Sequence, residues 1–448
     1  MGWPRFSVEM RPVILAVAAA LAFSSLRASG QTFQTIYSFR GSTDGSLPRS
    51  SLLYTGNGKL YGTTYYGGTN GMGTVYELAP SQSGWKESVI FSFNGTDGSN
   101  PIAGVAYSGG VLYGTTYIGG AGLGGFGAGT VFSLTPPTAP SGGWTEQVLY
   151  SFPGICDGQS SPIGPVLVET GGVLIGTTSV DGCITSNPSG GTVFALVPSE
   201  GGGAWTEHVL VDFYRSAVGN RPYSGFVASG GALFGTTYLS QNGGGCGMVY
   251  ATSPSQSGGS WTLTQVHNFS GPDGCNSQSG LTLGKSGVLY GATLSGGDAL
   301  PCDFPPFLVS GCGTVFQLTP PASPGGSWTE TVLYSFAGAN GDGAYPLSTL
   351  VIGQDGSLYG TTQYGGSAAA GSHCSFYGAT GCGTVFKLTP PSAPGGAWTE
   401  TVLHSFTGQG DDGAIPSAGL AVGPKGLLYG TTSHGGAGSQ GTVFAVAP

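Results

Sequence analysis

The chain has 448 residues, of which 87 are Gly and only 7% are charged, and its formal net charge is −9. Gly alternates with Val, Leu, Phe, Tyr and Trp, a pattern that favours an ordered all-β protein over a disordered low-complexity one. The acidic balance makes nucleic acid a poor partner.

Residues 1–30 have the pattern of a secretory signal peptide. Basic residues precede an apolar run over 13–23, which is shorter than the ~20 apolar residues of a membrane-spanning helix. Small residues at 28–30 end the segment, so we expect cleavage before Gln31, with an uncleaved membrane anchor as the alternative. Cleavage removes three Arg and one Glu and leaves 9 basic and 20 acidic residues, a net charge of −11. We expect residues 31–448 to be one secreted, periplasmic or cell-surface domain without a transmembrane segment.

Two short motifs repeat through the rest of the chain. Gly-Thr-Thr or a close variant begins at Gly62, Gly114, Gly176, Gly235, Gly291, Gly360 and Gly430. Gly-Thr-Val or a close variant begins at Gly73, Gly129, Gly191, Gly247, Gly313, Gly383 and Gly441. The variants are Gly-Ala-Thr at Gly291 and Gly-Met-Val at Gly247. Seven copies of one unit indicate a repeat architecture.

Each unit is expected to contain four short strands. In the third unit these strands are predicted at 164–168, 173–178, 191–196 and 205–213, where β-branched and aromatic runs lie between Gly, Pro and Ser clusters. Gly-Gly, Asn-Gly and Asp-Gly pairs, such as Asn57-Gly58 and Asp355-Gly356, predict tight two-residue hairpins between the first and second strands.

The two ends of the chain predict a closed ring. Fourth strands that begin with Trp occur six times, and the last unit stops at Pro448 after its third strand. The missing strand lies at the other end, because residues 32–39 match residues 145–152. We therefore predict an all-β, seven-bladed β-propeller with four antiparallel strands per blade, in which the N-terminal strand completes the last blade. The alternative is an open β-solenoid, which needs no such closure.

The repeated blocks Leu-Tyr-Gly-Thr-Thr, Gly-Thr-Val-Phe-x-Leu and Val-Leu-Tyr-Ser-Phe resemble the GloVer tandem repeat of exported bacterial proteins. The resemblance covers essentially the whole of residues 31–448. It implies export and display at the cell surface. It implies no particular activity and supplies no catalytic residues.

The loops between the two motifs vary in length, and we expect them to share one face of the ring with the loops after the fourth strands. Variable loops on a rigid scaffold are the usual location of binding residues. All eight Cys lie in loops of this face, and export with an even count predicts disulfides. We predict the pairs Cys156–Cys183, Cys246–Cys275, Cys302–Cys312 and Cys374–Cys382, with free or differently paired thiols as the alternative.

Aromatic residues of the variable loops are the candidate ligand-binding residues, because exposed aromatics with few charges suit sugar stacking or a protein partner. They are Tyr65, Tyr66, Tyr117, Phe126, Tyr238, Phe304, Phe307, Tyr364, Phe376 and Tyr377. The alternative is that they pack the loops onto the blades. The function we predict is an exported, monomeric binding or display module for a glycan or a cell-surface protein.

Two carboxylate patterns recur with the repeat. The Asp of the linkers between blades, at Asp44, Asp97, Asp157, Asp273, Asp342 and Asp412, is expected to shape a turn by bonding nearby backbone, with calcium binding as the alternative. The Glu of Trp-x-Glu, at Glu87, Glu146, Glu207, Glu330 and Glu400, is expected to be structural, although paired carboxylates also serve glycoside hydrolysis. Because each pattern supplies one residue per blade, we expect no metal, no cofactor and no catalytic residue among them.

Three predictions concern the remaining groups. His267 and His404 replace a repeated Tyr and are expected to be packing residues. The first strands, such as residues 418–422, are expected to line the channel with small apolar groups. The alternative function is a secreted carbohydrate-active enzyme, a hydrolase or lyase that uses the loop carboxylates Asp181, Asp298 or Asp303.

Overall fold

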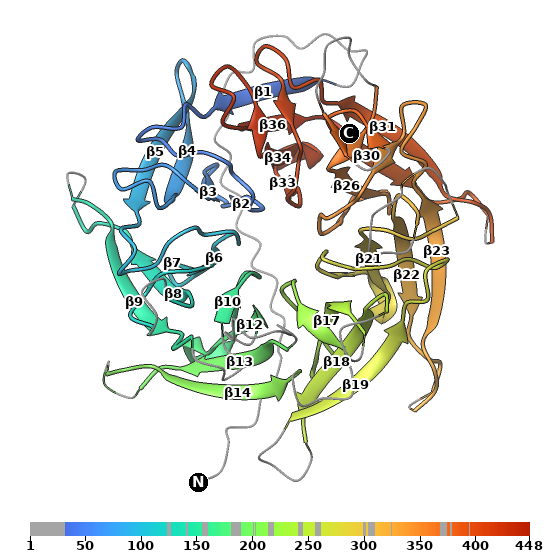
Figure 1. The fold of residues 1–448 in the computed structure, drawn as a ribbon, viewed down its shortest axis with the longest axis horizontal. Helices are drawn as coiled ribbons and strands as arrows, with labels where there is room; N and C mark the ends of the chain where they lie inside the picture. Colours follow the sequence, from blue (N-terminus) through green and yellow to red (C-terminus); the bar gives the residue numbers. More distant parts are fainter. Residues whose placement is uncertain are drawn as a thin grey trace.

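The computed structural model describes residues 32–122, 127–139, 142–154, 160–180, 190–199, 201, 203–213, 219–240, 245–255, 261–298, 302, 310–323, 325–367, 374–376, 379–393 and 395–448. They form seven antiparallel sheets arranged as blades around a central axis (Figure 1). The predicted all-β, seven-bladed propeller is therefore confirmed. No helix of the described residues is long and apolar enough to cross a membrane.

Each blade has four strands in simple order from the axis outward. The innermost strands are β2 (Leu53–Tyr54), β6 (Ala106–Ser108), β11 (Leu167–Val168), β16 (Val227–Ser229), β20 (Thr282–Leu283), β25 (Val351–Ile352) and β33 (Ala421–Val422). The second strands, which carry the Gly-Thr-Thr motif, are β3 (Leu60–Thr64), β7 (Val111–Thr116), β12 (Leu174–Val180), β17 (Ala232–Leu239), β21 (Leu289–Thr293), β26 (Leu358–Thr362) and β34 (Leu428–Thr432).

The third strands continue from the Gly-Thr-Val motif. They are β4 (Thr74–Ser81), β8 (Thr130–Thr135), β13 (Thr192–Val197), β18 (Met248–Pro254), β22 (Thr314–Thr319), β30 (Thr384–Thr389) and β36 (Thr442–Val446). The outer strands are β5 (Gly84–Ser92), β9 (Thr145–Ser151), β14 (Thr206–Asp212), β19 (Trp261–Asn268), β23 (Thr329–Ser335), β31 (Thr399–Ser405) and β1 (Phe33–Ser38).

Short segments at the ends of the blades complete the architecture. They are β10 (Ser160–Pro162), β15 (Asn220–Pro222), β24 (Gly343–Ala344), β27 (Tyr364–Gly365), β28 (Ser375–Phe376), β29 (Ala379–Thr380), β32 (Gly413–Ala414), β35 (His434–Gly435) and the 3-10 turns η1 (Thr170–Gly172), η3 (Lys285–Gly287) and η4 (Pro424–Gly426). Several of them pair a linker between blades with the start of a variable loop, as β24 does with β27 and β32 with β35. This pairing holds the two kinds of loop together on one face.

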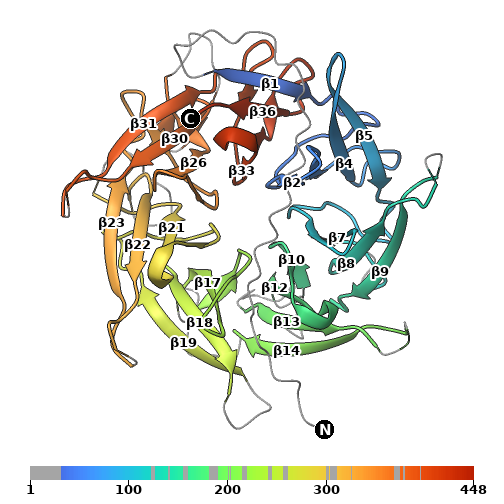
Figure 2. The ribbon, with the colours of Figure 1, turned by 180° about the vertical axis from the view of Figure 1, so that it is seen from behind.

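The first and last strands of the chain close the ring. β1 pairs antiparallel with β36, so that Phe33 lies opposite Val446 and Ser38 lies opposite Thr442. Seen from behind, β1 lies on the outer side of the last blade, next to β36 (Figure 2). The predicted permutation by one strand is thus correct.

The core is divided among the interfaces between blades. The buried side chains of the described residues form seven clusters, and each cluster joins two neighbouring blades. Every cluster contains one edge-to-face aromatic pair, in which the Phe after an outer strand meets the aromatic residue of the next blade's third strand. The pairs are Phe39–Tyr76, Phe93–Phe132, Phe152–Phe194, Phe213–Tyr250, Phe269–Phe316, Phe336–Phe386 and Phe406–Phe444, with centroids 5.0–5.2 Å apart.

The same aromatic rings explain the Gly of Gly-Thr-Thr. A Cβ atom added at Gly114 would lie 2.5 Å from Cζ of Phe132, and one added at Gly360 would lie 2.6 Å from Cζ of Phe386. The equivalent atom in the other five blades would lie 2.4–2.6 Å from the tip of the ring. Only Gly therefore allows the tip of the third-strand ring to come this close to the second strand.

The threonines of the two motifs join the second and third strands. The second Thr of Gly-Thr-Thr shares a hydroxyl–hydroxyl hydrogen bond with the Thr of Gly-Thr-Val, as in Thr64–Thr74 and Thr362–Thr384, both at 2.8 Å. The Gly that begins Gly-Thr-Val has a φ of 81–100° in all seven blades, including the fourth, where Met248 replaces the Thr. A left-handed residue is thus required where the third strand begins.

The hairpins between the first and second strands are of two kinds. Gly109-Gly110 and Gly230-Gly231 form the predicted two-residue loops, with positive φ at both residues. The prediction is wrong for Asn57-Gly58, Asp355-Gly356 and Gly171-Gly172, which lie in longer loops. Side-chain oxygens of Asn57 and Asp355 accept hydrogen bonds from the backbone N–H two residues later, which favours a wider turn.

Three of the four predicted disulfides are confirmed. They are Cys246–Cys275, Cys302–Cys312 and Cys374–Cys382. Cys156 and Cys183 lie outside the described residues. Disulfides are typical of proteins that fold in an oxidising, extracytoplasmic compartment.

We expect Gly360→Ala to destabilise the protein by about 1–3 kcal/mol, because the added methyl group overlaps the Phe386 ring. The control is Gly56→Ala, since a Cβ at Gly56 meets no atom within 4 Å. Calorimetric melting of both variants measures the difference. Equal melting temperatures would show that the blade repacks around the extra methyl group.

We expect Tyr76→Phe to leave stability unchanged or to raise it by up to about 1 kcal/mol. The buried hydroxyl groups of Tyr76 and Tyr250 have no hydrogen-bond partner among the described residues, and the other five blades carry Phe at this position. Urea unfolding of Tyr76→Phe and Tyr250→Phe tests this expectation. A clear loss of stability in either variant would mean that the hydroxyl group has a stabilising partner.

Candidate functional site

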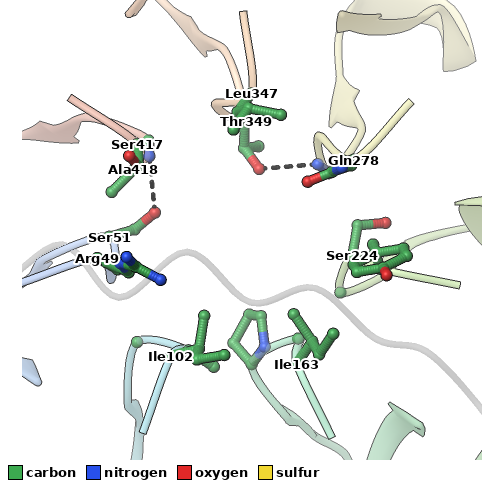
Figure 3. Close-up of a pocket in the computed structure, with 18 of the residues that line it drawn as sticks. Arg49, Ser51, Ile102, Ile163, Ser224, Gln278, Leu347, Thr349, Ser417 and Ala418 are labelled. Carbon is green, nitrogen blue, oxygen red and sulfur yellow. Dashed lines mark hydrogen bonds between the residues drawn. The ribbon is translucent and has the colours of Figure 1, made fainter. Parts of the chain in front are cut away.

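A cavity of about 630 Å³ lies at the centre of the ring. It is lined by the seven linkers that lead into the innermost strands and by residues that directly follow Gly-Thr-Thr, such as Tyr364 and His434. The cavity therefore opens on the face of the variable loops. We name it the cup (Figure 3).

The backbone of the cup wall repeats in every blade. Each linker contains one residue in the left-handed conformation, with a φ of 54–60°: Leu47, Asn100, Ser161, Arg221, Asn276, Tyr345 and Ile415. The backbone N–H of each of these residues donates to the carbonyl oxygen of the residue before the neighbouring Gly-Thr-Val, as Leu47 does to Gln440 at 2.9 Å and Tyr345 to Cys312 at 2.8 Å. In each of the seven blades, this hydrogen bond holds the strained left-handed conformation in place.

The side chains that this backbone presents to the cup differ from blade to blade. Two positions after the left-handed residue stand Arg49, Ile102, Ile163, Tyr223, Gln278, Leu347 and Ser417. Arg49, Ile102, Ile163 and Gln278 extend towards the middle of the cavity in Figure 3. The scaffold is thus repeated, whereas the chemistry of the wall is not.

Small residues form the floor of the cup. A Cβ atom added at Gly104 would lie 2.6 Å from the carbonyl oxygen of Ser51, so neighbouring linkers touch through their backbones. Two hydrogen bonds of 3.0 Å cross between blades, from Gly419 N–H to Ser51 Oγ and from Gly280 N–H to Thr349 Oγ1. Small groups line this part of the channel as predicted.

A ring of threonine hydroxyl groups joins the blades around this floor. The first Thr of Gly-Thr-Thr donates to a linker carbonyl of the next blade, as Thr63 does to Ala103 and Thr431 to Ser50, both at 3.1 Å. Ala292 replaces this Thr in the fifth blade. There, the Thr282 hydroxyl group donates to the carbonyl of Leu350 in the sixth blade instead. Hydrogen bonds between neighbouring blades therefore hold the floor of the cup together.

Charge in the cup comes from one residue. Arg49 is the only Lys or Arg among the described lining residues, and none of them is Asp or Glu. Its guanidinium carbon lies 5.0 Å from the centre of the Tyr65 ring. Burial and the charge of Arg49 lower the pKa of His434 below its usual value, so His434 is neutral at pH 7.

The structure places the predicted aromatic residues in different environments. Tyr364 lines the cup, and Tyr65 supports Arg49. Tyr66 is 47% exposed, while Tyr117 and Tyr238 are half-buried, and the Tyr238 ring contacts Tyr223 in the cup wall. Phe126, Phe304, Phe307 and Tyr377 lie outside the described residues, as does the side chain of Phe376. The ligand-binding role of all ten residues remains a prediction.

Sequence reasoning missed most of the cup wall. The signal that marks it is the residue after the Pro of each linker, as in Pro48-Arg49 and Pro101-Ile102, with Ser277 in place of Pro in the fifth blade. Alignment of the seven copies shows that this residue varies within an otherwise repeated segment. Only the folded ring shows that the seven copies face one cavity.

The two repeating carboxylates meet across the blade interfaces, outside the cup. Burial, reinforced by the neighbouring linker Asp, raises the pKa of Glu87, Glu146 and Glu400 to about 7. The fold thus brings one Glu and one Asp of the two repeating patterns together at these interfaces. Each described linker Asp accepts a backbone N–H of its own linker, as Asp44 does from Arg40 at 3.0 Å, which confirms the predicted turn for these five residues. Asp157 lies outside the described residues.

One interface offers a group of possible metal ligands. Atoms of His267, Asp273 and Glu330 lie within 4.8 Å of one another, and no other such group occurs among the described residues. His267 Nε2 and Asp273 Oδ2 are 2.9 Å apart. At other interfaces Tyr37 and Tyr334 donate to the equivalent Asp, so we interpret His267 as a structural hydrogen-bond partner.

His404 has both packing and polar contacts. Its ring stacks on Phe33 with centroids 3.5 Å apart, and its Nε2 lies 3.1 Å from Asp412 Oδ1. Phe33 stands where five of the other six outer strands have the Glu of Trp-x-Glu, and the sixth has Leu263. The predicted packing role of His404 is confirmed, at the interface that closes the ring.

The candidate catalytic carboxylates are not placed together. Asp298 is exposed in a variable loop and does not line the cup. Asp181 and Asp303 lie outside the described residues. The described part of the cup therefore offers no carboxylate pair for general acid and base catalysis.

Comparison with known proteins identifies the repeat. Residues 22–187 and 124–374 match the model of the Gloeobacter/Verrucomicrobia repeat. The chain belongs to this family. No curated protein matches the chain.

Solved structures resemble this Gloeobacter/Verrucomicrobia repeat protein only in fold. A Bacteroides uniformis protein assigned provisionally as a 6-phosphogluconolactonase is 15% identical over 79% of this chain and 84% of its own, with a TM-score of 0.46. A Xanthomonas campestris gluconolactonase is 13% identical over 73% and 85%, with a TM-score of 0.38. Trypanosoma rangeli sialidase is 10% identical over 94% and 59%, with a TM-score of 0.43. Likeness this distant carries no argument about activity.

We expect this repeat protein to lose stability as pH rises from about 4.5 to about 7. Glu87, Glu146, Glu330 and Glu400 have a pKa of about 7 in the fold against 4.5 for an unperturbed Glu, so ionising them costs free energy only in the folded state. The lowered pKa of His434 acts in the opposite direction, as a single group. Urea unfolding at pH 5.5 and pH 8 measures the change.

The control is the variant with Gln at all four Glu positions, in which we expect a flatter pH profile. The pKa values of Asp273 and Asp412 are lowered below 3.8, so their effect falls below this pH window. An equally steep profile in the variant would show that other groups cause the pH dependence.

Proposed function

We propose that this chain is an exported binding module that holds a saccharide in the cup at the centre of its variable-loop face. The observation that carries the proposal is the contrast within the cup wall. Seven linkers share one hydrogen-bonded backbone, yet they present Arg, Tyr, Gln, Ser and aliphatic side chains to a single cavity. Such a wall can distinguish the sides of a small asymmetric ligand.

The size and chemistry of the cup support a saccharide. Its volume of about 630 Å³ falls within the ~300–1,000 Å³ range of small-molecule sites. The wall combines apolar surfaces, such as Ile102 and Ile163, with neutral hydrogen-bonding groups, such as Gln278 and Ser417. Tyr364 in the wall and exposed Tyr66 on the same face add aromatic surfaces. Secretion or retention at the cell surface is part of the proposal, supported by the three disulfides.

The test is a glycan array with the purified protein, beside an assay for release of reducing ends. We expect binding without turnover, and we expect Tyr364→Ala to weaken binding because it removes part of the cup wall. Tyr107→Ala is the matched control, since Tyr107 is 53% exposed on β6 and does not line the cup.

Other outcomes would contradict the proposal. Turnover that is lost in Asp298→Asn or Asp303→Asn would show a carbohydrate-active enzyme instead. Binding that is reduced equally by Tyr364→Ala and Tyr107→Ala would place the ligand outside the cup. Silence in both assays would favour a protein partner.

A further inference from the structure

We infer that the cup selects a carboxylate-bearing saccharide, with Arg49 as the residue that recognises the carboxylate. This inference rests on the proposed function and specifies the class of ligand. The charge of the cup wall supports it. Among the described residues that line the cup, Arg49 is the only Lys or Arg, and none is Asp or Glu.

The guanidinium group of Arg49 is held but not neutralised. The Tyr65 ring supports it at 5.0 Å, and Tyr65 is itself packed edge-to-face on Tyr66 with centroids 4.5 Å apart. No described residue forms a hydrogen bond or an ion pair with the Arg49 side chain. The N–H groups of the Arg49 guanidinium therefore have no acceptor among the described residues and are available to a ligand.

The free edge of Arg49 matches one kind of ligand group. A guanidinium fork donates two parallel hydrogen bonds to a carboxylate, and such charge-assisted bonds are stronger than neutral ones. Figure 3 shows the Arg49 side chain directed into the cavity rather than away from it. A carboxylate bound there would supply the counter-charge that the described wall lacks.

The rest of the wall suits the other parts of a sugar acid. Ile102 and Ile163 come from adjacent blades and present apolar surface for the C–H face of a pyranose ring. Gln278 offers an amide to ring hydroxyl groups, and no described residue hydrogen-bonds its side chain. Ser417 receives a hydrogen bond from Gln363 at 2.9 Å, which orients its hydroxyl group at the wall.

Long-range electrostatics cannot produce this preference. The chain without residues 1–30 has a net charge of −11, and a field of that sign repels anions. His434 does not add positive charge at pH 7, because burial and Arg49 lower its pKa. We therefore assign a preference for an anionic sugar to Arg49, because Arg221, whose charge acts on Tyr223 of the cup wall, does not itself line the cup. One substitution tests this assignment.

The experiment is isothermal titration of the purified protein with trigalacturonate and with neutral galactotriose, which differ in carrying carboxylate or hydroxymethyl groups. We expect trigalacturonate to bind at least about tenfold more tightly, since a charge-assisted hydrogen bond is stronger than a neutral one. We expect Arg49→Gln to abolish that preference and Arg49→Lys to retain part of it. Lys425→Gln is the control, because it removes a positive charge from η4, away from the cup.

The outcomes separate this inference from the proposed function. Equal binding of both sugars, with no effect of Arg49→Gln, would overturn the inference and leave a neutral-saccharide module. A preference for trigalacturonate that survives Arg49→Gln would overturn the role of Arg49. Binding of neither sugar at millimolar concentration, while other neutral glycans bind on the array, would overturn the inference alone. Thermal melting of Arg49→Gln and Arg49→Lys confirms that the exposed substitutions leave the fold intact.

Discussion

The contact between the Gly of each Gly-Thr-Thr and the aromatic ring of the following third strand is the constraint on which the propeller depends. In the sixth blade the Phe386 ring lies so close to Gly360 that no side chain fits between them. The opposite side of the interface supplies Phe336, edge-to-face at 5.1 Å. One ring therefore sets both the spacing of strands within a blade and the angle between two blades. The arrangement recurs seven times, which explains why the motif tolerates little variation.

The repeated scaffold frees the cup to vary. The linkers are held by hydrogen bonds to the carbonyl before Gly-Thr-Val, and their floor is held by the ring of threonine hydroxyl groups. Neither interaction uses the side chain that faces the cavity. Arg49 and Ile102 therefore occupy the same backbone position with different chemistry, and the identity of a ligand can change without cost to the fold. This separation of scaffold and wall is the main physical support for a binding role.

Charged residues are scarce, and most of those described have a structural task. The linker Asp accepts backbone N–H groups of its own loop, and the Glu of the adjacent outer strand is half-buried beside it. These acids shape the linkers and the blade interfaces, and none of those described lines the cup. Arg49 differs from these acids because no described residue carries a charge that pairs with it. It lies instead over the Tyr65 ring. The contrast makes Arg49 a charged group of the cup wall whose function the fold alone does not explain.

The number of blades, the strand order, the closing strand and three confirmed disulfides could all be predicted from the sequence. These features depend on local or periodic signals, such as the spacing from Gly62 to Gly73 and the match of residues 32–39 to an outer strand. Even the hairpin error was local, since Asn57 and Asp355 bond backbone two residues on and widen the turn. The tertiary structure alone decided that Glu87 meets Asp44, that Tyr65 supports Arg49, and that Arg49, Gln278 and Ile163 face one cavity. Those contacts join residues from different strands and blades. Aromatic packing sets the rotation of each blade about the axis, and this rotation brings the residues together.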